Sequence, residues 1–282
     1  GGNNSGREGR LDRPTIKIKM EKRYIEIFTG LKRDYGYADI TSAFKDPSTG
    51  KLKLKYGWAA KELLNSDYMA HLEGKKSIGV QPCNDDGLAN FGAIDIDSDE
   101  YDNFDLRKYL EIIDKKNIPV VPVKSKSGGL HIYVFFKEPV KASYVRNFLD
   151  KLLFTFGLKA STEIFPKQTQ LGMGSDGKFI NGNFINLPYY NRNERVGLNL
   201  DGTEFTFEQF IKVVEANRKT KEELEEFATE LMRLELTGGA DEFADGPVCL
   251  QRLSKSKLDD YRDRFIYNYM VFAKKKYPDN WE

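Results

Sequence analysis

The chain has 282 residues, of which 40% are hydrophobic, 31% charged and 13% aromatic, a composition typical of a well-packed globular protein and not of a disordered one. Its 44 lysines and arginines nearly balance 43 aspartates and glutamates, which excludes the overall positive charge of many nucleic-acid-binding proteins, so any contact with a polyanion must be local. Cys83 and Cys249 lack the paired spacing of a zinc site, and the absence of a long apolar run or a secretion signal leads us to expect a cytoplasmic protein without a membrane partner.

The N-terminal part divides into a polar start and a more regular block. Residues 1–12 are rich in glycine, asparagine and serine, and predict a disordered linker or tag. Residues 13–90 predict an α/β module that is mostly helical up to Gly74 and has a strand over 77–80. Lys51, Lys53 and Lys55 alternate beside Tyr56 and Trp58. This pattern suits a solvated edge strand or a surface for phosphates and stacked bases.

The middle of the chain alternates strands and helices. Ile94 and Ile96 face one side of a predicted strand, while Asp95 and Asp97 face the other. A helical pattern follows over 106–113, and two strands over 120–124 and 131–136 are joined by a loop short enough for an antiparallel hairpin. A second helix ends at Gly157, before a strand around Glu163.

This order of elements predicts an α+β fold with a split βαβ core. Such a core has an antiparallel or mixed sheet with helices on one face, which leaves the other face open for chemistry. We assign this core to residues 91–204 and combine it with the N-terminal module as one domain over 13–204. Helical patterns predominate over 205–282, where Thr206 and Gln209 have the spacing of a capping box.

Three carboxylates are candidate metal ligands. Asp95 and Asp97, on one strand face, could share divalent cations, or they could belong to a solvated strand edge. Glu163 stands on a strand that runs into Pro166 and Lys167, a pattern that also fits an edge strand ended by proline.

The loop between the two predicted hairpin strands is a candidate anion site. Ser127–Gly129 offers backbone N–H groups without Cβ obstruction, and Lys124 and Lys126 add positive charge beside it. His131 begins the outgoing strand, so its imidazole can point at the same anion, for which phosphate is the natural choice. The alternative is an ordinary Gly-Gly turn followed by an incidental histidine.

These residues also form an ordered series of motifs. The series contains Asp95-x-Asp97, Ser127-Gly128-Gly129-x-His131, Glu163–Gln168 and Gly182-Asn183-x-x-Asn186-Leu187-Pro188-Tyr189. It resembles the motifs of archaeo-eukaryotic primases, and is most similar to the primase-polymerases of phages, plasmids, conflict systems and CRISPR-associated operons. The segments 28–33, 71–80 and 245–250 resemble the same group, so that the similarity covers roughly residues 22–280.

The resemblance implies an RRM-like catalytic core and a role for each motif. Asp95, Asp97 and Glu163 would bind Mg²⁺ or Mn²⁺ and carry the catalysis. Some conflict-system relatives place the third carboxylate one residue earlier, where this chain has Thr162. Ser127, Gly128, Gly129 and His131 would bind the incoming triphosphate with Lys124, and Lys167 would provide a second phosphate contact.

The sequence therefore predicts a nucleotidyltransferase. We expect a primase-polymerase that makes and extends a primer strand on a single-stranded DNA template by two-metal-ion phosphoryl transfer, using dNTPs, NTPs or both. Clustered carboxylates also serve metal-dependent nucleases, and a Gly-rich loop also suits a non-catalytic module that binds nucleotides or single strands. Both remain alternatives.

Overall fold

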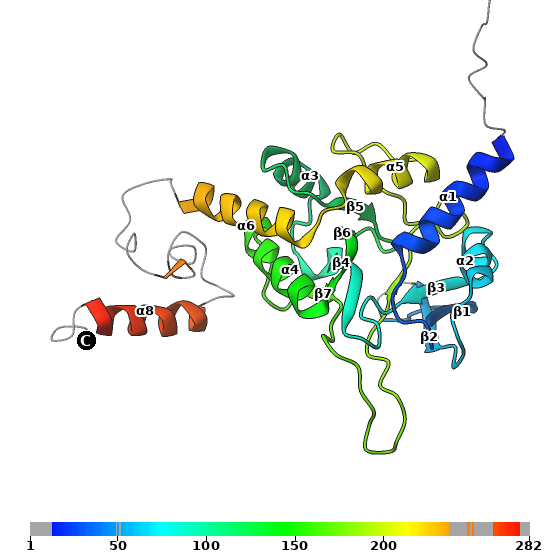
Figure 1. The fold of residues 1–282 in the computed structure, drawn as a ribbon, viewed down its shortest axis with the longest axis horizontal. Helices are drawn as coiled ribbons and strands as arrows, with labels where there is room; N and C mark the ends of the chain where they lie inside the picture. Colours follow the sequence, from blue (N-terminus) through cyan, green and yellow to red (C-terminus); the bar gives the residue numbers. More distant parts are fainter. Residues whose placement is uncertain are drawn as a thin grey trace, which may run out of the picture.

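Two antiparallel four-stranded sheets lie side by side at the centre of the fold (Figure 1). The computed structural model describes residues 13–48, 50, 52–236, 247, 248, 250 and 262–276; the expected linker over 1–12, Lys51 and residues 245, 246 and 249 of the tail segment lie outside this part. The first sheet has the order β2-β1-β3-β8 and the second β5-β6-β4-β7. The strands are β1 (Gly36–Lys45), β2 (Leu52–Trp58), β3 (Ser77–Val80), β4 (Leu88–Ile96), β5 (Val121–Lys124), β6 (Leu130–Lys141), β7 (Glu163–Phe165) and β8 (Ile185–Asn186).

The described helices are α1 (Arg13–Ile27), α2 (Asn65–Leu72), the short 3₁₀ helix η1 (Ser98–Glu100), α3 (Leu106–Lys115), α4 (Ala142–Phe156), α5 (Phe207–Asn217), α6 (Lys221–Leu236) and α8 (Arg262–Lys276). Helices α1 to α5 lie around the sheets, whereas α6 runs away from them and α8 lies apart at the left (Figure 1). No helix in the described ranges is both long enough and apolar enough to cross a membrane.

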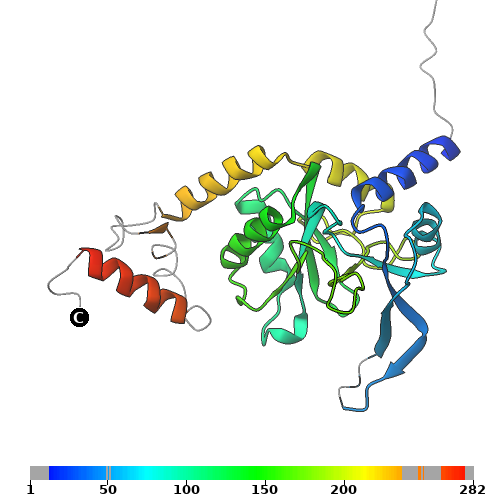
Figure 2. The ribbon, with the colours of Figure 1, turned by 60° about the horizontal axis from the view of Figure 1, so that its bottom comes forward.

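The first sheet corrects the expectation of a mostly helical block before Gly74. Strands β1 and β2 pair as an antiparallel ribbon that projects from the body (Figure 2). Beyond Ile40 the residues of β1 are exposed or half-buried on both faces, so this stretch lacks the apolar alternation that marks a strand in sequence. The fourth strand, β8, comes from far along the chain. This sheet contains strands from before and after residue 90. The division of the domain into two modules at that residue stays a prediction.

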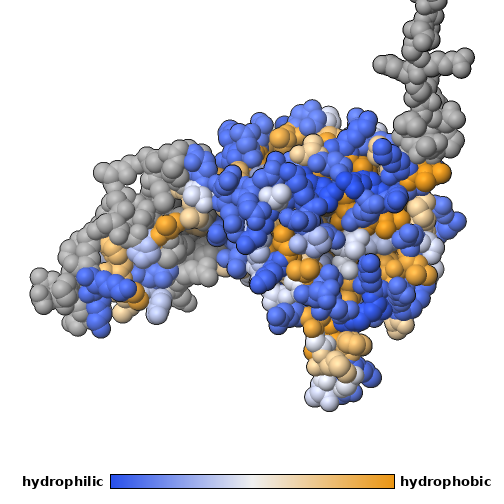
Figure 3. Space-filling model, viewed as in Figure 1, coloured by the Kyte–Doolittle hydropathy of each residue, from blue (hydrophilic) through white to orange (hydrophobic). Residues whose placement is uncertain are grey.

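A long loop between β7 and β8 projects from the bottom of the body in Figure 1. Its hairpin is closed by a bridge between Met173 and Phe179, and it exposes apolar side chains amid polar surface (Figure 3). Arg33 fastens its base, because the guanidinium lies 4.5 Å from the centre of the Phe179 ring and donates to the carbonyl of Ile180.

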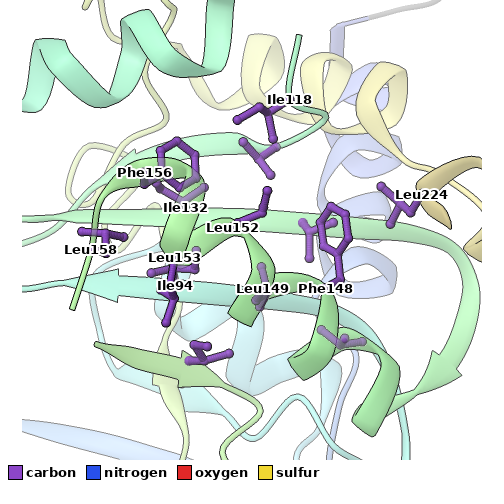
Figure 4. Packing of buried hydrophobic residues seen from close by; sticks show 14 of the residues in the cluster. Ile94, Ile118, Ile132, Phe148, Leu149, Leu152, Leu153, Phe156, Leu158 and Leu224 are labelled. Carbon is purple, nitrogen blue, oxygen red and sulfur yellow. The ribbon is translucent and has the colours of Figure 1, made fainter. Parts of the chain in front are cut away.

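The second sheet is the predicted split βαβ core, and the α+β fold class is confirmed. Its elements run β4-α3-β5-β6-α4-β7, and neighbouring strands are antiparallel. Helix α4 buries Leu149, Leu152 and Leu153 against the sheet side that carries Ile94 and Ile132 (Figure 4). This packing fixes β4 with Phe91, Ala93 and Asp95 on the opposite face.

We had expected the sheet face opposite α4 to be open. It is instead covered over most of its area. Phe28, which follows α1, lies 5.3 to 5.9 Å from the ring centres of Phe91, Tyr133 and Phe135. Helix α5 adds Phe210 to this cluster. Alternate aromatic side chains on β4 and β6 need burial, because exposing them would cost about 25 cal/mol for each Å² of apolar surface. Only the end of this face that carries Asp95 remains accessible.

Helices account for the described part of the chain after residue 205. Thr206 Oγ1 accepts a hydrogen bond from the Gln209 N–H (3.2 Å), and Gln209 Oε1 accepts one from the Thr206 N–H (2.8 Å), which confirms the capping box. Helix α5 packs into the aromatic core and so belongs to the main body.

His71 joins α2 to the first sheet as a neutral side chain. Its Nδ1 accepts from the Ile78 N–H (3.1 Å), and its Nε2–H donates to the Pro188 carbonyl (3.0 Å). Burial, with the nearby charge of Arg195 acting in the same direction, lowers the pKa of His71 to about 3. A proton on Nδ1 would therefore break the buried hydrogen bond from the Ile78 N–H.

We predict that His71 makes the protein acid-sensitive. The unfolded chain binds the proton below a pKa of about 6.5 and the folded chain only near 3, so stability is present above about pH 6.5 and falls as the pH drops. Urea unfolding should show a loss of about 2–3 kcal/mol between about pH 6 and pH 4 that is missing in His71→Gln.

Carboxylates contribute equally to the pH dependence of stability in the wild type and in His71→Gln, so they do not account for a difference between the two. Equal slopes for the wild type and His71→Gln would contradict this assignment.

Candidate active site

Strand register places three of the predicted residues in one row. Asp95 on β4 is paired with His131 on β6 and, on its other side, with Glu163 on β7. Side chains of directly paired residues project from the same face with Cβ atoms about 5 Å apart. The structure therefore brings together a histidine and two carboxylates that are far apart in the sequence.

His131 and Asp95 form the buried part of this row. His131 Nε2 lies 3.2 Å from Asp95 Oδ1, and His131 is almost fully buried, whereas the Asp95 side chain is 30% exposed. Burial raises the pKa of Asp95, but the charge and hydrogen bond of His131, with the charge of Lys167, outweigh it and lower the pKa below its usual value. Asp95 is therefore ionised at neutral pH.

Glu163, and not Thr162, shares the face of Asp95. Thr162 is buried and its hydroxyl is 2.6 Å from the Tyr101 hydroxyl, whereas Glu163 is paired with Asp95 and half-exposed. Lys167 forms an ion pair with Glu163, and its Nζ lies 5.4 Å from the centre of the Phe165 ring. The geometry thus favours Glu163 as the third carboxylate.

Asp97 lies just beyond the end of β4. It is exposed, and its carboxylate accepts a hydrogen bond from the Asp99 N–H (3.2 Å), which caps η1. In the described part of the chain no three His, Cys, Asp or Glu side chains are grouped closely enough to hold a metal ion. Asp95 and Glu163 supply the adjacent carboxylate oxygens that Mg²⁺ and Mn²⁺ prefer, and Asp97 is the nearest further carboxylate along the strand.

The predicted anion loop packs against the same end of β4. Gly128 has φ 86°, and a Cβ on Gly129 would lie 2.2 Å from the Ile96 carbonyl oxygen, so this hairpin requires glycine at both positions. The Ser127 hydroxyl lies 3.2 Å from that of Ser125, and the Ser127 carbonyl accepts from the Ser98 hydroxyl (3.4 Å). The loop therefore adjoins the Asp97 end of the strand.

Lys124 lies away from the row. Its neighbour Val123 is paired with His131, so Lys124 projects to the opposite face. Its Nζ is 3.3 Å from Glu204 Oε1. This position gives no support to a phosphate contact.

The row lies on one side of a pocket of about 320 Å³ between the two sheets. The opposite side is an aromatic wall, which we define as Tyr56, Trp58 and Phe184. The rings of Trp58 and Phe184 are 5.1 Å apart, and Phe184 lies over Gly36 and Gly79, where a Cβ would come within 2.3 Å of its ring. A pocket with charged groups on one side and aromatic rings on the other suits a nucleotide.

Sequence reasoning identified part of this pocket. Tyr56 and Trp58 were candidates for base stacking, and strand alternation places them on the face of β2 opposite Lys53 and Lys55. Phe184 was missed. The signal that could have found it is the pair of glycines on neighbouring strands, which leave room for a large ring.

We predict that Gly129→Ala destabilises the protein by about 1–3 kcal/mol, because its Cβ would overlap the Ile96 carbonyl. Gly172→Ala is the matched control, because none of the described atoms lies within 4 Å of the Cβ it would add and its φ is not in the left-handed region. Urea unfolding of both variants measures the difference. Equal stabilities would show that the loop does not need this close approach.

Comparison with known proteins agrees with the motifs. Residues 31–226 match the family described as the archaeo-eukaryotic primase domain of TOTE conflict systems. The comparison with curated proteins gives no match. Among solved structures, the archaeo-eukaryotic primase domain of the cyanophage S-2L primase-polymerase (PrimPol) is similar, with 12% sequence identity and a TM-score of 0.33 over 73% of this chain and 100% of that one. The matched family domain spans more than half of the sequence, and the chain therefore belongs to the archaeo-eukaryotic primase family.

Proposed function

We propose that this protein is a template-directed primase-polymerase that synthesises and extends primers on single-stranded DNA. The observation that carries the proposal is the row of His131, Asp95 and Glu163 facing an aromatic wall across one pocket. A nucleotide needs both sides, because its triphosphate is charged and its base has an apolar face. Membership of the primase family supports the same chemistry.

Divalent cations complete such a site. Asp95 and Glu163, with Asp97 from the end of β4, would hold Mg²⁺ or Mn²⁺. When bound, these ions neutralise charge on the transferring phosphate and lower the pKa of the attacking 3′-hydroxyl. The lowered pKa of Asp95 keeps its carboxylate ready as a ligand at neutral pH.

The remaining residues bind and orient the nucleotide. Nδ1 of His131 is buried without a hydrogen-bond partner among the described atoms, and the His131 side chain lines the pocket, so a protonated ring would offer this N–H to a phosphate oxygen. The Ser127–Gly129 loop is the predicted second phosphate contact, and Lys167 a third. The aromatic wall offers the base a stacking surface.

We predict that Asp95→Asn combined with Asp97→Asn abolishes nucleotide incorporation, a loss of roughly a thousandfold or more, because the charge that holds the cations is removed without a change of shape. The assay is a gel with labelled nucleotide, unprimed single-stranded template and Mn²⁺. Asp102→Asn removes an exposed carboxylate outside the pocket and should retain wild-type incorporation. Wild-type primer extension by the double variant would remove the hypothesis.

A second prediction concerns metal removal. Triphosphate affinity measured by calorimetry should fall by at least about tenfold when EDTA replaces Mn²⁺, because the carboxylates then repel the phosphates. Unchanged affinity would instead indicate a binding module without a catalytic role. Degradation of a labelled oligonucleotide without added triphosphate would indicate a nuclease.

A further inference from the structure

Two side-chain polar atoms in the described part of the chain are buried and lack a hydrogen-bond partner. They are Nδ1 of His131 and Oδ1 of Asn186. Both side chains line the pocket between the sheets. A buried acceptor without a partner destabilises the folded state, and an unpaired atom beside a pocket is well placed for a hydrogen bond from a ligand.

Asn186 stands between the aromatic wall and the histidine. On β8 it shares a face with Phe184, whose ring contacts Trp58. Its own backbone carbonyl accepts from the Tyr133 hydroxyl (3.5 Å). The Tyr133 ring lies 6.0 Å from the His131 ring, which connects Asn186 to the charged side of the pocket.

The unpaired atom is a carboxamide oxygen, so its partner must be a donor. Phosphate oxygens are ionised at neutral pH and cannot donate. A base stacked on the aromatic wall and a triphosphate directed toward His131 leave the sugar in the space between them. In that arrangement the hydroxyl groups of the sugar would be the donors placed next to Asn186.

We propose that Asn186 is a specificity-determining residue that accepts a hydrogen bond from a sugar hydroxyl of the incoming nucleotide. This inference rests on the proposed function, because it assumes that the pocket holds a nucleoside triphosphate. It assigns to Asn186 a preference among nucleotides that differ only in the sugar.

The same pocket contains a matched control. Asn183 also lines it, but Asn183 Oδ1 already accepts a hydrogen bond from Gln168 Nε2 (2.7 Å), and the Asn183 N–H donates to Gln168 Oε1 (2.9 Å). Removing the Asn183 carboxamide changes the pocket wall without removing a free acceptor.

The test is incorporation of one nucleotide onto a primed template with Mn²⁺. Values of kcat/KM are compared for ribo-, 2′-deoxy-, 3′-deoxy- and 2′,3′-dideoxynucleoside triphosphates. Two variants remove the acceptor: Asn186→Leu, which has nearly the same shape, and Asn186→Ala. Each should lower kcat/KM roughly threefold to tenfold for the triphosphates that carry the recognised hydroxyl. For the triphosphates that lack this hydroxyl, kcat/KM should stay unchanged. The 2′-deoxy and 3′-deoxy arms identify which hydroxyl is bound.

Two further variants separate recognition from general damage. Asn186→Asp keeps an acceptor oxygen and should keep the wild-type ratio between sugars, because its added charge affects every triphosphate alike. Asn183→Ala should also keep that ratio. Thermal unfolding checks that each variant is folded. If one of the two acceptor-free variants, Asn186→Leu or Asn186→Ala, does not fold, the other carries the test.

The outcomes distinguish this inference from the proposed function. An equal loss for all four triphosphates, or no change in their ratios, would overturn the role of Asn186 while wild-type incorporation upholds the polymerase. Failure of the wild type to incorporate any of them would remove the proposed function and this inference with it.

Discussion

The register of β4 with its two neighbours is the constraint on which the site depends. The pairing of Asp95 with His131 and Glu163 follows from the antiparallel ladders. A shift of one residue in either ladder would move a charged side chain to the other face of the sheet, into the core beneath α4. That register is fixed from behind, because Ile94 and Ile132 must face α4. Hydrophobic packing on one side of the sheet thus positions the charged groups on the other.

Local patterns in the sequence were enough to predict this part of the molecule. Alternation around Asp95 gave the strand and its two faces, and the short loop before His131 gave the hairpin. The order of elements then gave the split βαβ core, because few arrangements connect such elements without crossing. The family motifs predicted Glu163 beside them, and the pairing of β4 with β7 places Glu163, and not Thr162, on the face of Asp95.

Strand β1 of the first sheet and the place of Phe184 in the aromatic wall could not be predicted in this way. Strand β1 is exposed on both sides beyond Ile40, so no periodicity reveals it. Phe184 reaches Trp58 only because β8 joins the first sheet from far along the chain. The expectation of an open sheet face was wrong for a related reason, since its cover comes from residues near Phe28 that no local pattern connects to it.

The charges of the pocket are balanced in a way that bears on how it works. Asp95 contacts His131, and Glu163 is paired with Lys167, so each carboxylate of the row has a basic partner. The Asp95–His131 and Glu163–Lys167 contacts are partly exposed or adjoin the pocket. Replacing one charged partner by another there costs less free energy than leaving a charge buried without a partner. A triphosphate bound in this pocket, as we propose, would compete with the carboxylates for the two basic side chains. We therefore expect nucleotide binding to be linked to the release of the carboxylate oxygens from His131 and Lys167. The same four side chains would then form a stable arrangement without ligand and offer free carboxylate oxygens to cations once a nucleotide is bound.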